Sequence, residues 1–216
     1  MTGSKKTENG NLTAKLELRR YFLRRYHSDG SANVMDCCQG SGVLWGRLRE
    51  EFQLSGYWGV DVKPKKGRLK IDSARILAQP GWTQDVIDID TYGSPWRHWL
   101  ALLRTIDHSA TVFLTVGQVQ IAGSPLQNVV RERLQLGSLG IPNAIAATLN
   151  KIAVSWLLTT GCGNYKITIV EAVEAVSDGN ARYIGLRVEP VKANGPELSP
   201  PSRSKRARTK KEFENV

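Results

Sequence analysis

Apolar residues along the chain fall into short runs, separated by stretches in which they recur every three or four positions. The short runs predict strands, and the longer spacing predicts amphipathic helices. Strands are expected at residues 33–37, 57–60, 68–71, 85–89 and 110–116. One helix is expected to begin at Leu12, and a second, after residue 42, is expected to end at about Phe52. Further helices are expected at residues 73–77, 96–106 and 143–158.

The last part of the chain has a different pattern. Residues 165–176 and 181–190 alternate apolar and polar side chains, and the Ser-Asp-Gly-Asn segment between them has the chemistry of a tight turn. This combination predicts a β-hairpin. Strand–helix alternation followed by a hairpin predicts an α/β fold, with a three-layer, mostly parallel sheet and one antiparallel strand at its C-terminal end.

Basic side chains are concentrated at the two ends of the chain. Of 216 residues, 30 are Lys or Arg and 20 are Asp or Glu, which gives a formal net charge of +10. Residues 1–26 carry +5 and residues 194–216 carry +3, so the middle is nearly neutral at +2. Basic ends suit a polyanion, and the expected partner is a nucleic acid (RNA or DNA), bound through the basic N-terminal helix and the C-terminal tail. A role in solubility alone is the alternative.

The pattern predicts one domain with short appendages. We expect a disordered N-terminus at residues 1–11, a domain at residues 12–193 that includes the basic helix, and a flexible basic tail at residues 194–216. On the helix, Lys15 and Arg19 fall on one edge, whereas Arg20 and Arg24 fall on another. This spacing predicts a half-buried helix with solvated basic flanks.

Several classes of protein are disfavoured by composition. No apolar run reaches the roughly 18 residues that a bilayer span needs, and the polar start MTGSKKTENG has no secretory character. A cytoplasmic protein without membrane contact is therefore expected. The 3 cysteines are too few for a disulfide framework. No histidine has metal-ligand spacing to another histidine or to a cysteine, so no metal is expected.

Four carboxylates stand where predicted strands end: Asp36, Asp61, Asp72 and Asp90. The carboxyl ends of parallel strands share one edge of a sheet, where α/β folds bind their ligands. These side chains are therefore expected to line one rim. Asp61 could instead cap a turn, and Asp72 could equally cap the helix that starts at Ser73.

The first of these acids opens a glycine turn between a strand and a helix, Asp36-Cys-Cys-Gln-Gly40-Ser-Gly42. Glycine allows a positive φ and a close approach of backbone to ligand. The spacing is neither the dinucleotide fingerprint nor a P-loop, and Asp36 would repel a phosphate but attract an ammonium group. About 20 residues later, Asp61 is placed to bind the two hydroxyls of a ribose, and Asp72 to accept from an adenine amino group.

This order of glycine turn and acids resembles the class I S-adenosylmethionine-dependent methyltransferases over residues 30–192. The resemblance implies a Rossmann-like methyltransferase sheet and S-adenosylmethionine as cofactor. The resemblance implies that Gly40 and Gly42 form the turn around the methionine part of the cofactor and that Asp36 orients that end. It also implies that Asp61 binds the ribose and that Asp72 contacts the adenine. Cys38 stands where many members have glycine, and it is expected to pack rather than to act as a nucleophile.

A second motif follows the fourth predicted strand. Asp90-Thr-Tyr92-Gly-Ser94-Pro95 is similar to the Asp-Pro-Phe/Tyr-Gly-Ser-Pro segment of tRNA guanine dimethyltransferases, and more loosely to the Asp-Pro-Pro-Tyr motif of base amino-group methyltransferases. The resemblance implies that Asp90 accepts from the target amine, that Tyr92 stacks on the base, and that Ser94 and Pro95 shape the loop. Thr91 replaces the family's proline.

Two neighbours of this motif are also candidates. Asp88 shares the strand face of Asp90 and is expected to be a buried, hydrogen-bonded support. Trp96, at the start of the next helix, is a candidate for the rim of a base pocket.

The chemistry requires residues of this kind. An exocyclic amine is a poor nucleophile because its lone pair is delocalised into the base, and a carboxylate that accepts an N–H helps to free that pair. The expected function is an S-adenosylmethionine-dependent N-methyltransferase that acts on a base amino group of a nucleic acid by direct displacement. The alternatives are a catalytically inactive, methyltransferase-like nucleic-acid-binding module, motivated by Thr91 and Cys38, and a small-molecule or protein methyltransferase.

Overall fold

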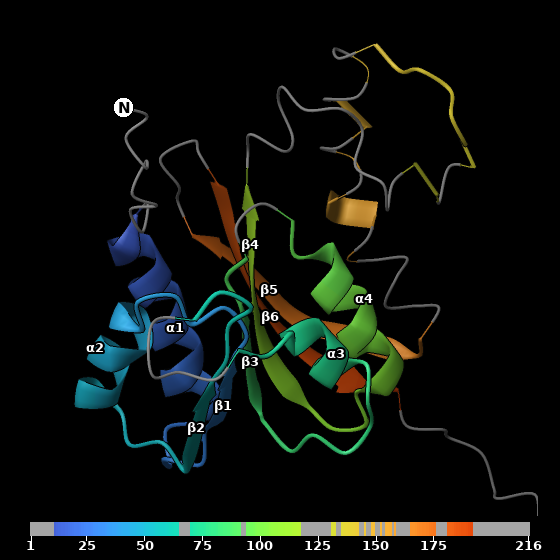
Figure 1. The fold of residues 1–216 in the computed structure, drawn as a ribbon. Coiled ribbons are helices and arrows are strands. Elements are labelled where there is room, and N and C mark those ends of the chain that lie inside the picture. Colours follow the sequence, from blue (N-terminus) through green and yellow to red (C-terminus); the bar gives the residue numbers. More distant parts are fainter. Residues whose placement is uncertain are drawn as a thin grey trace, which may run out of the picture.

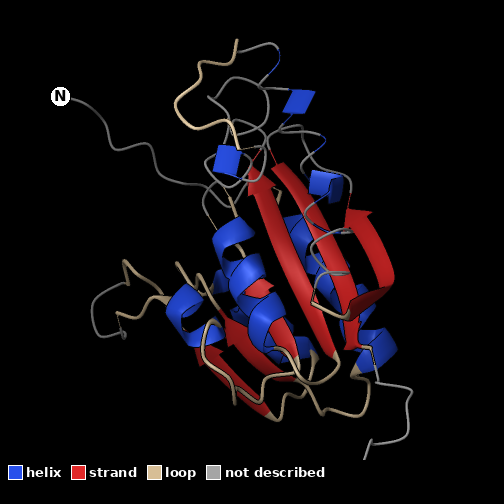
Figure 2. Ribbon diagram, turned by 90° about the vertical axis from the view of Figure 1, so that its right-hand side faces the viewer, coloured by secondary structure: helices blue, strands red, loops and turns tan. Residues whose placement is uncertain are grey.

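A single mixed sheet forms the centre of the protein, and helices cover both of its faces (Figures 1 and 2). The computed structural model describes residues 11–64, 70–91, 94–117, 131–132, 135–142, 165–175 and 181–191, and in addition residues 145, 148–149, 152, 154–156 and 158. The helices are α1 (Leu12–Tyr26), α2 (Val43–Glu51), α3 (Ser73–Leu77) and α4 (Trp96–Thr105). The strands are β1 (Asn33–Asp36), β2 (Gly56–Gly59), β3 (Val86–Ile89), β4 (Ala110–Gly117), β5 (Ile167–Ala175) and β6 (Ala181–Pro190).

The strand order is β2-β1-β3-β4-β6-β5. Strands β1 to β4 pair in parallel, whereas β6 runs antiparallel between β4 and β5. The predicted α/β fold, with a mostly parallel sheet and a C-terminal hairpin strand, is confirmed. The strand expected at residues 68–71 is represented by one parallel bridge between Asp61 and Lys70, because residues 65–69 lie outside the described part of the chain.

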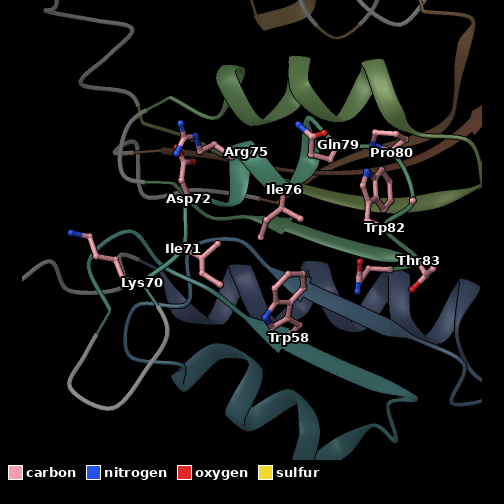
Figure 3. A pocket seen from close by; sticks show the side chains of 12 residues that line it. Trp58, Lys70, Ile71, Asp72, Arg75, Ile76, Gln79, Pro80, Trp82 and Thr83 are labelled. Carbon is pink, nitrogen blue, oxygen red and sulfur yellow. The ribbon is translucent and has the colours of Figure 1, made fainter.

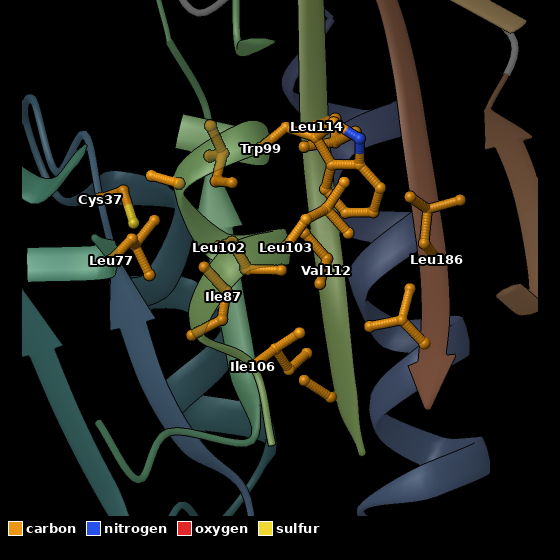
Figure 4. Close-up of a cluster of buried hydrophobic side chains, with 14 of the residues drawn as sticks. Cys37, Leu77, Ile87, Trp99, Leu102, Leu103, Ile106, Val112, Leu114 and Leu186 are labelled. Atoms are coloured by element: carbon orange, nitrogen blue, oxygen red, sulfur yellow. The ribbon is translucent and has the colours of Figure 1, made fainter. Parts of the chain in front are cut away.

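The two faces of the sheet have separate hydrophobic cores. On one face, Trp99 and Leu102 of α4 pack with Val112 and Leu114 of β4 (Figure 4). On the other face, α1 and α2 cover Phe113 of the same strand. This division follows from the two-residue period of a strand, since successive side chains point to opposite faces.

Helix α1 lies across β4, β5 and β6, and two contacts fix it there. Phe22 packs edge-to-face on Phe113, with ring centroids 5.7 Å apart, and it also lies against Gly185 of β6. A Cβ atom at Gly185 would come within 2.4 Å of the Phe22 ring, so only glycine lets the helix approach so closely. At the same C-terminal end of α1, the Glu171 carboxylate on β5 accepts from the hydroxyls of Tyr21 and Tyr26 and from Arg25.

Other predictions concern parts of the chain that are only partly described. The described residues between 145 and 158 are helical, in agreement with the helix predicted there. The expected N-terminal segment, except residue 11, the turn at residues 177–180 and the basic tail lie outside the described residues. Among the helices that the structure describes, none is both long and apolar enough to cross a membrane.

Candidate functional site

The carboxyl ends of β1, β2 and β3 form the rim that the sequence predicted. Between β1 and α2 the chain makes a tight glycine turn, in which Gly40 has φ +50° and Gly42 has φ +73°. The N–H of Gly42 donates to the carbonyl of Gln39 at 2.7 Å, and Gly42 is the N-cap residue of α2. Both positive φ values lie in the left-handed region, where glycine is favoured.

Asp61 binds this turn directly. Its Oδ2 accepts from the backbone N–H of Gly40 at 2.9 Å, and its Oδ1 accepts from the backbone N–H of Lys63 at 2.7 Å. The carboxylate is half-buried and lies at the end of β2. The predicted neighbourhood of Asp61 and Gly40 is therefore present, and the turn is held to the second strand.

Asp36 is buried beneath the turn, with only 4% of its surface exposed. The hydroxyl of Tyr57 donates to its Oδ2 at 2.9 Å. Burial and the nearby charge of Asp88 raise the pKa of Asp36 to about 7. Burial destabilises the ionised form of this carboxyl group, and a cationic ligand beside it would stabilise that form. Asp36 is therefore suited to bind a cation.

Cys38 follows Cys37 in the turn, and the Cys37 N–H donates to the carbonyl of Asp88 in β3 at 2.9 Å. Burial raises the pKa of the Cys38 thiol, and the charges of Asp90, Asp36 and Asp61 raise it further. These carboxylates are therefore all within electrostatic range of one side chain. Burial also raises the pKa of the Cys37 thiol. Both thiols are protonated near neutral pH, in agreement with packing roles rather than nucleophilic ones.

Asp90 does not stand alone at the end of β3. The ammonium of Lys15, from α1, donates to Oδ1 at 2.8 Å and to Oδ2 at 2.7 Å. The Asp90 side chain is 19% exposed, whereas that of Lys15 is 7% exposed. Burial opposes ionisation of Asp90, but the charges of Lys15 and Arg19 outweigh it and lower the pKa of Asp90. Asp90 is thus an anion that reaches the surface of the rim.

Asp88 is the buried support that the sequence predicted. It accepts from Arg19 Nε at 2.7 Å, from Arg19 Nη2 at 2.6 Å and from the indole N–H of Trp45 at 2.7 Å. The predicted solvated flank of α1 is wrong for Lys15 and Arg19, which point into the sheet. Helical spacing alone could not reveal this, because the carboxylates that compensate these cations lie far away in the sequence.

The rest of the second motif leads into α4. Thr91 follows Asp90, and its buried Oγ1 has no hydrogen-bond partner among the described residues. Tyr92 and Gly93 lie outside the described residues. Pro95 is buried and precedes the first turn of α4, where its carbonyl accepts from Trp99 N–H at 2.9 Å. The prediction that Trp96 borders a base pocket is wrong, since it is 1% exposed and belongs to the core beside Trp99.

Asp72 has the capping role that was the alternative to adenine binding. Its Oδ1 accepts from Ala74 N–H at 3.1 Å, and its Oδ2 accepts from Arg97 at 2.7 Å. Both oxygens are therefore engaged. The Ile71 N–H donates to the Asp61 carbonyl at 3.0 Å, which places residue 72 close to the end of β2.

A groove of about 690 Å³ leads away from Asp72 between α3 and β2. Trp58 on β2 and Ile76 on α3 point toward each other across it (Figure 3). The groove runs from Ile71 and Asp72 at the rim to Trp82 near the start of β3. The groove is large enough for a flat ring, and it lies beside Ile71 and Asp72, where the resemblance places the adenine.

The sequence offers two interpretations of His98, a group for proton removal beside Trp96 or a solvated residue of the helix, and the structure shows it partly buried rather than solvated. The Ser73 hydroxyl donates to the carbonyl of Cys37 at 2.7 Å, so its oxygen accepts from His98 Nε2 at 3.0 Å. Burial lowers the pKa of His98, and its Nδ1 has no partner among the described residues. Within the described part of the chain, no group of three or more His, Cys, Asp or Glu side chains is arranged to hold a metal ion.

Comparisons with known proteins place the fold. No family model and no curated protein matches the sequence. Among solved structures, Trm1 from Pyrococcus horikoshii, in complex with S-adenosyl-L-methionine, has a TM-score of 0.56 at 13% identity, over 83% of this chain and 54% of that one. The chain has the Rossmann-like α/β fold of that structure. A hemolysin candidate from Lactococcus lactis has a TM-score of 0.53 at 10% identity, over 82% of this chain and 88% of that one.

At these identities the likeness concerns the fold alone. The chain also spans only about half the length of the Trm1 structure, at 54%. Activity and substrate therefore have to be argued from the site.

Proposed function

We propose that this chain is an S-adenosylmethionine-dependent N-methyltransferase that acts on an amino group of a nucleic-acid base. The observation that carries the proposal is the shared edge at the strand ends: Asp61 accepts from the Gly40 N–H of the glycine turn at 2.9 Å, Asp36 pairs with Asp88 on the neighbouring strand, and Asp90 lies two residues beyond Asp88. A carboxylate for the amine and the candidate cofactor residues thus share one rim. The motif resemblance at Asp90–Pro95 and the fold shared with the Trm1 structure support the same reaction.

The residues present suit S-adenosylmethionine. Buried Asp36 would face the cationic methionine end, and Asp61 would hold the ribose while it also holds the turn. Among the described residues, apart from the two chain neighbours, the Cys38 carbonyl alone lies within 4 Å of a Cβ position at Gly40, at 3.8 Å, which leaves room for a ligand. Trp58 and Ile76 face each other across the groove beside Ile71, so we assign the adenine ring to this groove. This assignment leaves Asp72 to cap α3 and bind Arg97. When bound, the cofactor supplies an electrophilic methyl group on a sulfonium.

Asp90 supplies the chemistry on the substrate side. Its ionised carboxylate accepts an N–H of the target amine, which draws the nitrogen toward a tetrahedral shape and aligns its lone pair with the methyl group. Tyr92 would stack on the base and fix its plane. The contribution of the protein is alignment rather than strong acid–base catalysis, and the proton leaves to water after transfer.

The outer face of α1 supports a polyanionic substrate. A hollow of about 560 Å³ is lined by Arg20, Arg24 and Arg25 together with Glu17 and Tyr21. Arg20 pairs with Glu51 and Arg25 with Glu171, but these pairs are exposed, so phosphates can compete for the guanidinium groups. In the proposed complex this face and the basic tail bind the nucleic-acid backbone.

Two measurements test the proposal. Calorimetric titration with S-adenosylmethionine should give one binding site, which Asp61→Ala weakens strongly. Incubation with labelled cofactor and separate pools of RNA and DNA, followed by nucleoside analysis, should give an N-methylated base. Asp90→Asn should lose transfer but keep cofactor binding. Cofactor binding without methylated nucleoside in either pool would contradict the substrate class.

A second candidate is a non-catalytic, nucleic-acid-binding module with this fold. The observation in its favour is that Lys15 already occupies both oxygens of Asp90. Nucleic-acid affinity that persists without measurable cofactor binding would support it. If the protein is instead a small-molecule or protein methyltransferase, substrate binding should depend little on salt concentration. Contacts to the phosphates of a nucleic acid would make that dependence steep.

A further inference from the structure

We propose that Lys15 is a positioning residue for Asp90: it fixes the direction of the carboxylate and keeps it anionic, so that an oxygen is ready to accept from the target amine. The inference rests on the proposed role of Asp90 and adds a residue from outside the motif that the sequence revealed. Lys15 precedes Asp90 by 75 positions and reaches it from another element.

The contact has the geometry of a fixed pair. The Lys15 ammonium lies 2.7 and 2.8 Å from the two oxygens of Asp90, and the residue as a whole is 6% exposed. It also lies over the ring of Tyr183, 5.2 Å from the centroid. An ammonium bound between a carboxylate and an aromatic face has little freedom, so it restrains the carboxylate in turn.

The backbone of α1 is held at the same place. Arg19 donates from Nη1 to the carbonyl of Lys15 at 3.0 Å, while its other nitrogens bind Asp88. One guanidinium thus joins the helix turn that bears Lys15 to the strand that leads into Asp90. Glu171 holds the other end of α1 to the sheet.

Lys15 also completes the charge balance around Asp90. The ionisable groups near this carboxylate are Arg19 on α1, Asp36 at the end of β1, Asp88 on β3 and the Cys38 thiol of the turn. Thr115 of β4 adds a hydrogen bond. Without Lys15, three carboxylates would share one guanidinium, and protonation of Asp90 would relieve their repulsion. A protonated Asp90 is a much poorer acceptor for an amine.

Binding of Lys15 is compatible with binding of the substrate. A carboxylate offers about four lone-pair positions, and Lys15 and Thr115 leave at least one of them for the amine. Lys15 itself is not required to exchange a proton during transfer. Its role is to be present, charged and immobile.

The electrostatic part can be tested without a substrate. In protein labelled with ¹³C at the aspartate carboxyl carbons, Asp90→Asn assigns the Asp90 signal, and its titration is followed by NMR. Lys15→Met should raise the pKa of Asp90 by at least one unit, a tenfold change in its ionisation constant. Lys15→Gln, which keeps a donor without charge, serves if the methionine variant does not fold. Arg20→Met, on the same helix but away from the rim, is the matched control.

Methyl transfer to the RNA and DNA pools tests the positioning part. Lys15→Met should lower kcat at least tenfold, keep the affinity for S-adenosylmethionine, and move the acid limb of the pH–rate profile to higher pH. An unchanged Asp90 titration overturns the proposal. A variant with higher kcat or lower KM also overturns it, because Lys15 would then be a competitor of the amine. If the titration shifts but the wild-type protein transfers no methyl group, the assignment of Lys15 to Asp90 stands and the proposed function fails.

Discussion

Arg19 and Asp88 form a two-point ion pair in the interior, with both side chains 1% exposed. The indole N–H of Trp45 also donates to this carboxylate, at 2.7 Å. The pair joins α1 to β3 directly below the end of the strand, where Asp90 begins the candidate motif. Removal of one partner would leave the other charge buried without compensation, so the protein is expected to be sensitive to the loss of either side chain.

Arg19→Met should therefore lower the free energy of unfolding by about 3–5 kcal/mol. Urea denaturation followed by tryptophan fluorescence measures the loss. Arg20→Met is the control, since it removes an exposed cation from the same helix and should leave the unfolding midpoint nearly unchanged. Equal effects of the two substitutions would show that the buried pair contributes nothing special.

Gly185→Ala should displace α1 and destabilise the protein by about 1–3 kcal/mol, since the new methyl group would overlap the ring of Phe22. Gly46→Ala provides the comparison, because a Cβ at this position of α2 meets no atom within 4 Å. Alanine is the better helix former, so this variant should be unchanged or slightly more stable. Thermal unfolding of both variants distinguishes them, and a neutral Gly185→Ala would contradict the close approach of α1 to β6.

The contribution of Asp36 to stability should fall as pH rises between about 4 and 7, against the opposite slope of His27 and His98, whose pKa burial lowers. Asp36 has its pKa raised to about 7 in the folded chain, against an ordinary value of 3.8. In that window the folded state keeps a proton on Asp36 that the unfolded state has released, so the contribution of Asp36 to the free energy of unfolding decreases with pH and becomes level above it. Asp36→Asn should remove up to about 4 kcal/mol of this decrease. Denaturant titrations at several pH values measure the free energy of unfolding of the wild-type protein and of Asp36→Asn. If the two proteins show the same dependence on pH, the proposed contribution of Asp36 is ruled out.

The same carboxyl group should make cofactor binding depend on pH. If ionised Asp36 accepts from the aminium of S-adenosylmethionine, binding below pH 7 must release the Asp36 proton. The affinity should then fall by up to tenfold for each unit of pH below that value. Calorimetry between pH 5.5 and 8 measures the trend, with Asp36→Asn as the variant that reports only the titration of the ligand. An identical pH dependence in both proteins would remove Asp36 from the cofactor site.

Local pattern predicted the fold and part of the site, for identifiable reasons. The acids at strand ends could be found because a buried run followed by a carboxylate identifies the carboxyl edge of a parallel sheet. The sequence also offered the correct alternative for Asp72, since an Asp before a short helix is a common N-cap. Asp88 was found to be a buried support because the strand period places it on the face of Asp90.

The contacts of α1 could not be found in this way. Lys15 and Arg19 are basic residues four positions apart, as are the more exposed Arg20 and Arg24. Periodicity does not distinguish a cation that faces a carboxylate from one that faces water. The difference arises from where α1 crosses the sheet, which depends on Gly185. Trp96 was misplaced for a related reason: the apolar face of α4 turns it into the core together with Trp99.

The packing of Phe22 against Gly185 has a consequence for how the protein folds during synthesis. Helix α1 is synthesised early, whereas β6 is the last strand that the structure describes. Until β6 is in place, α1 has α2 and β4 to pack against but lacks its close contact with Gly185. The cations of α1 are therefore expected to reach their final positions at the candidate site only after these two distant parts of the chain have met.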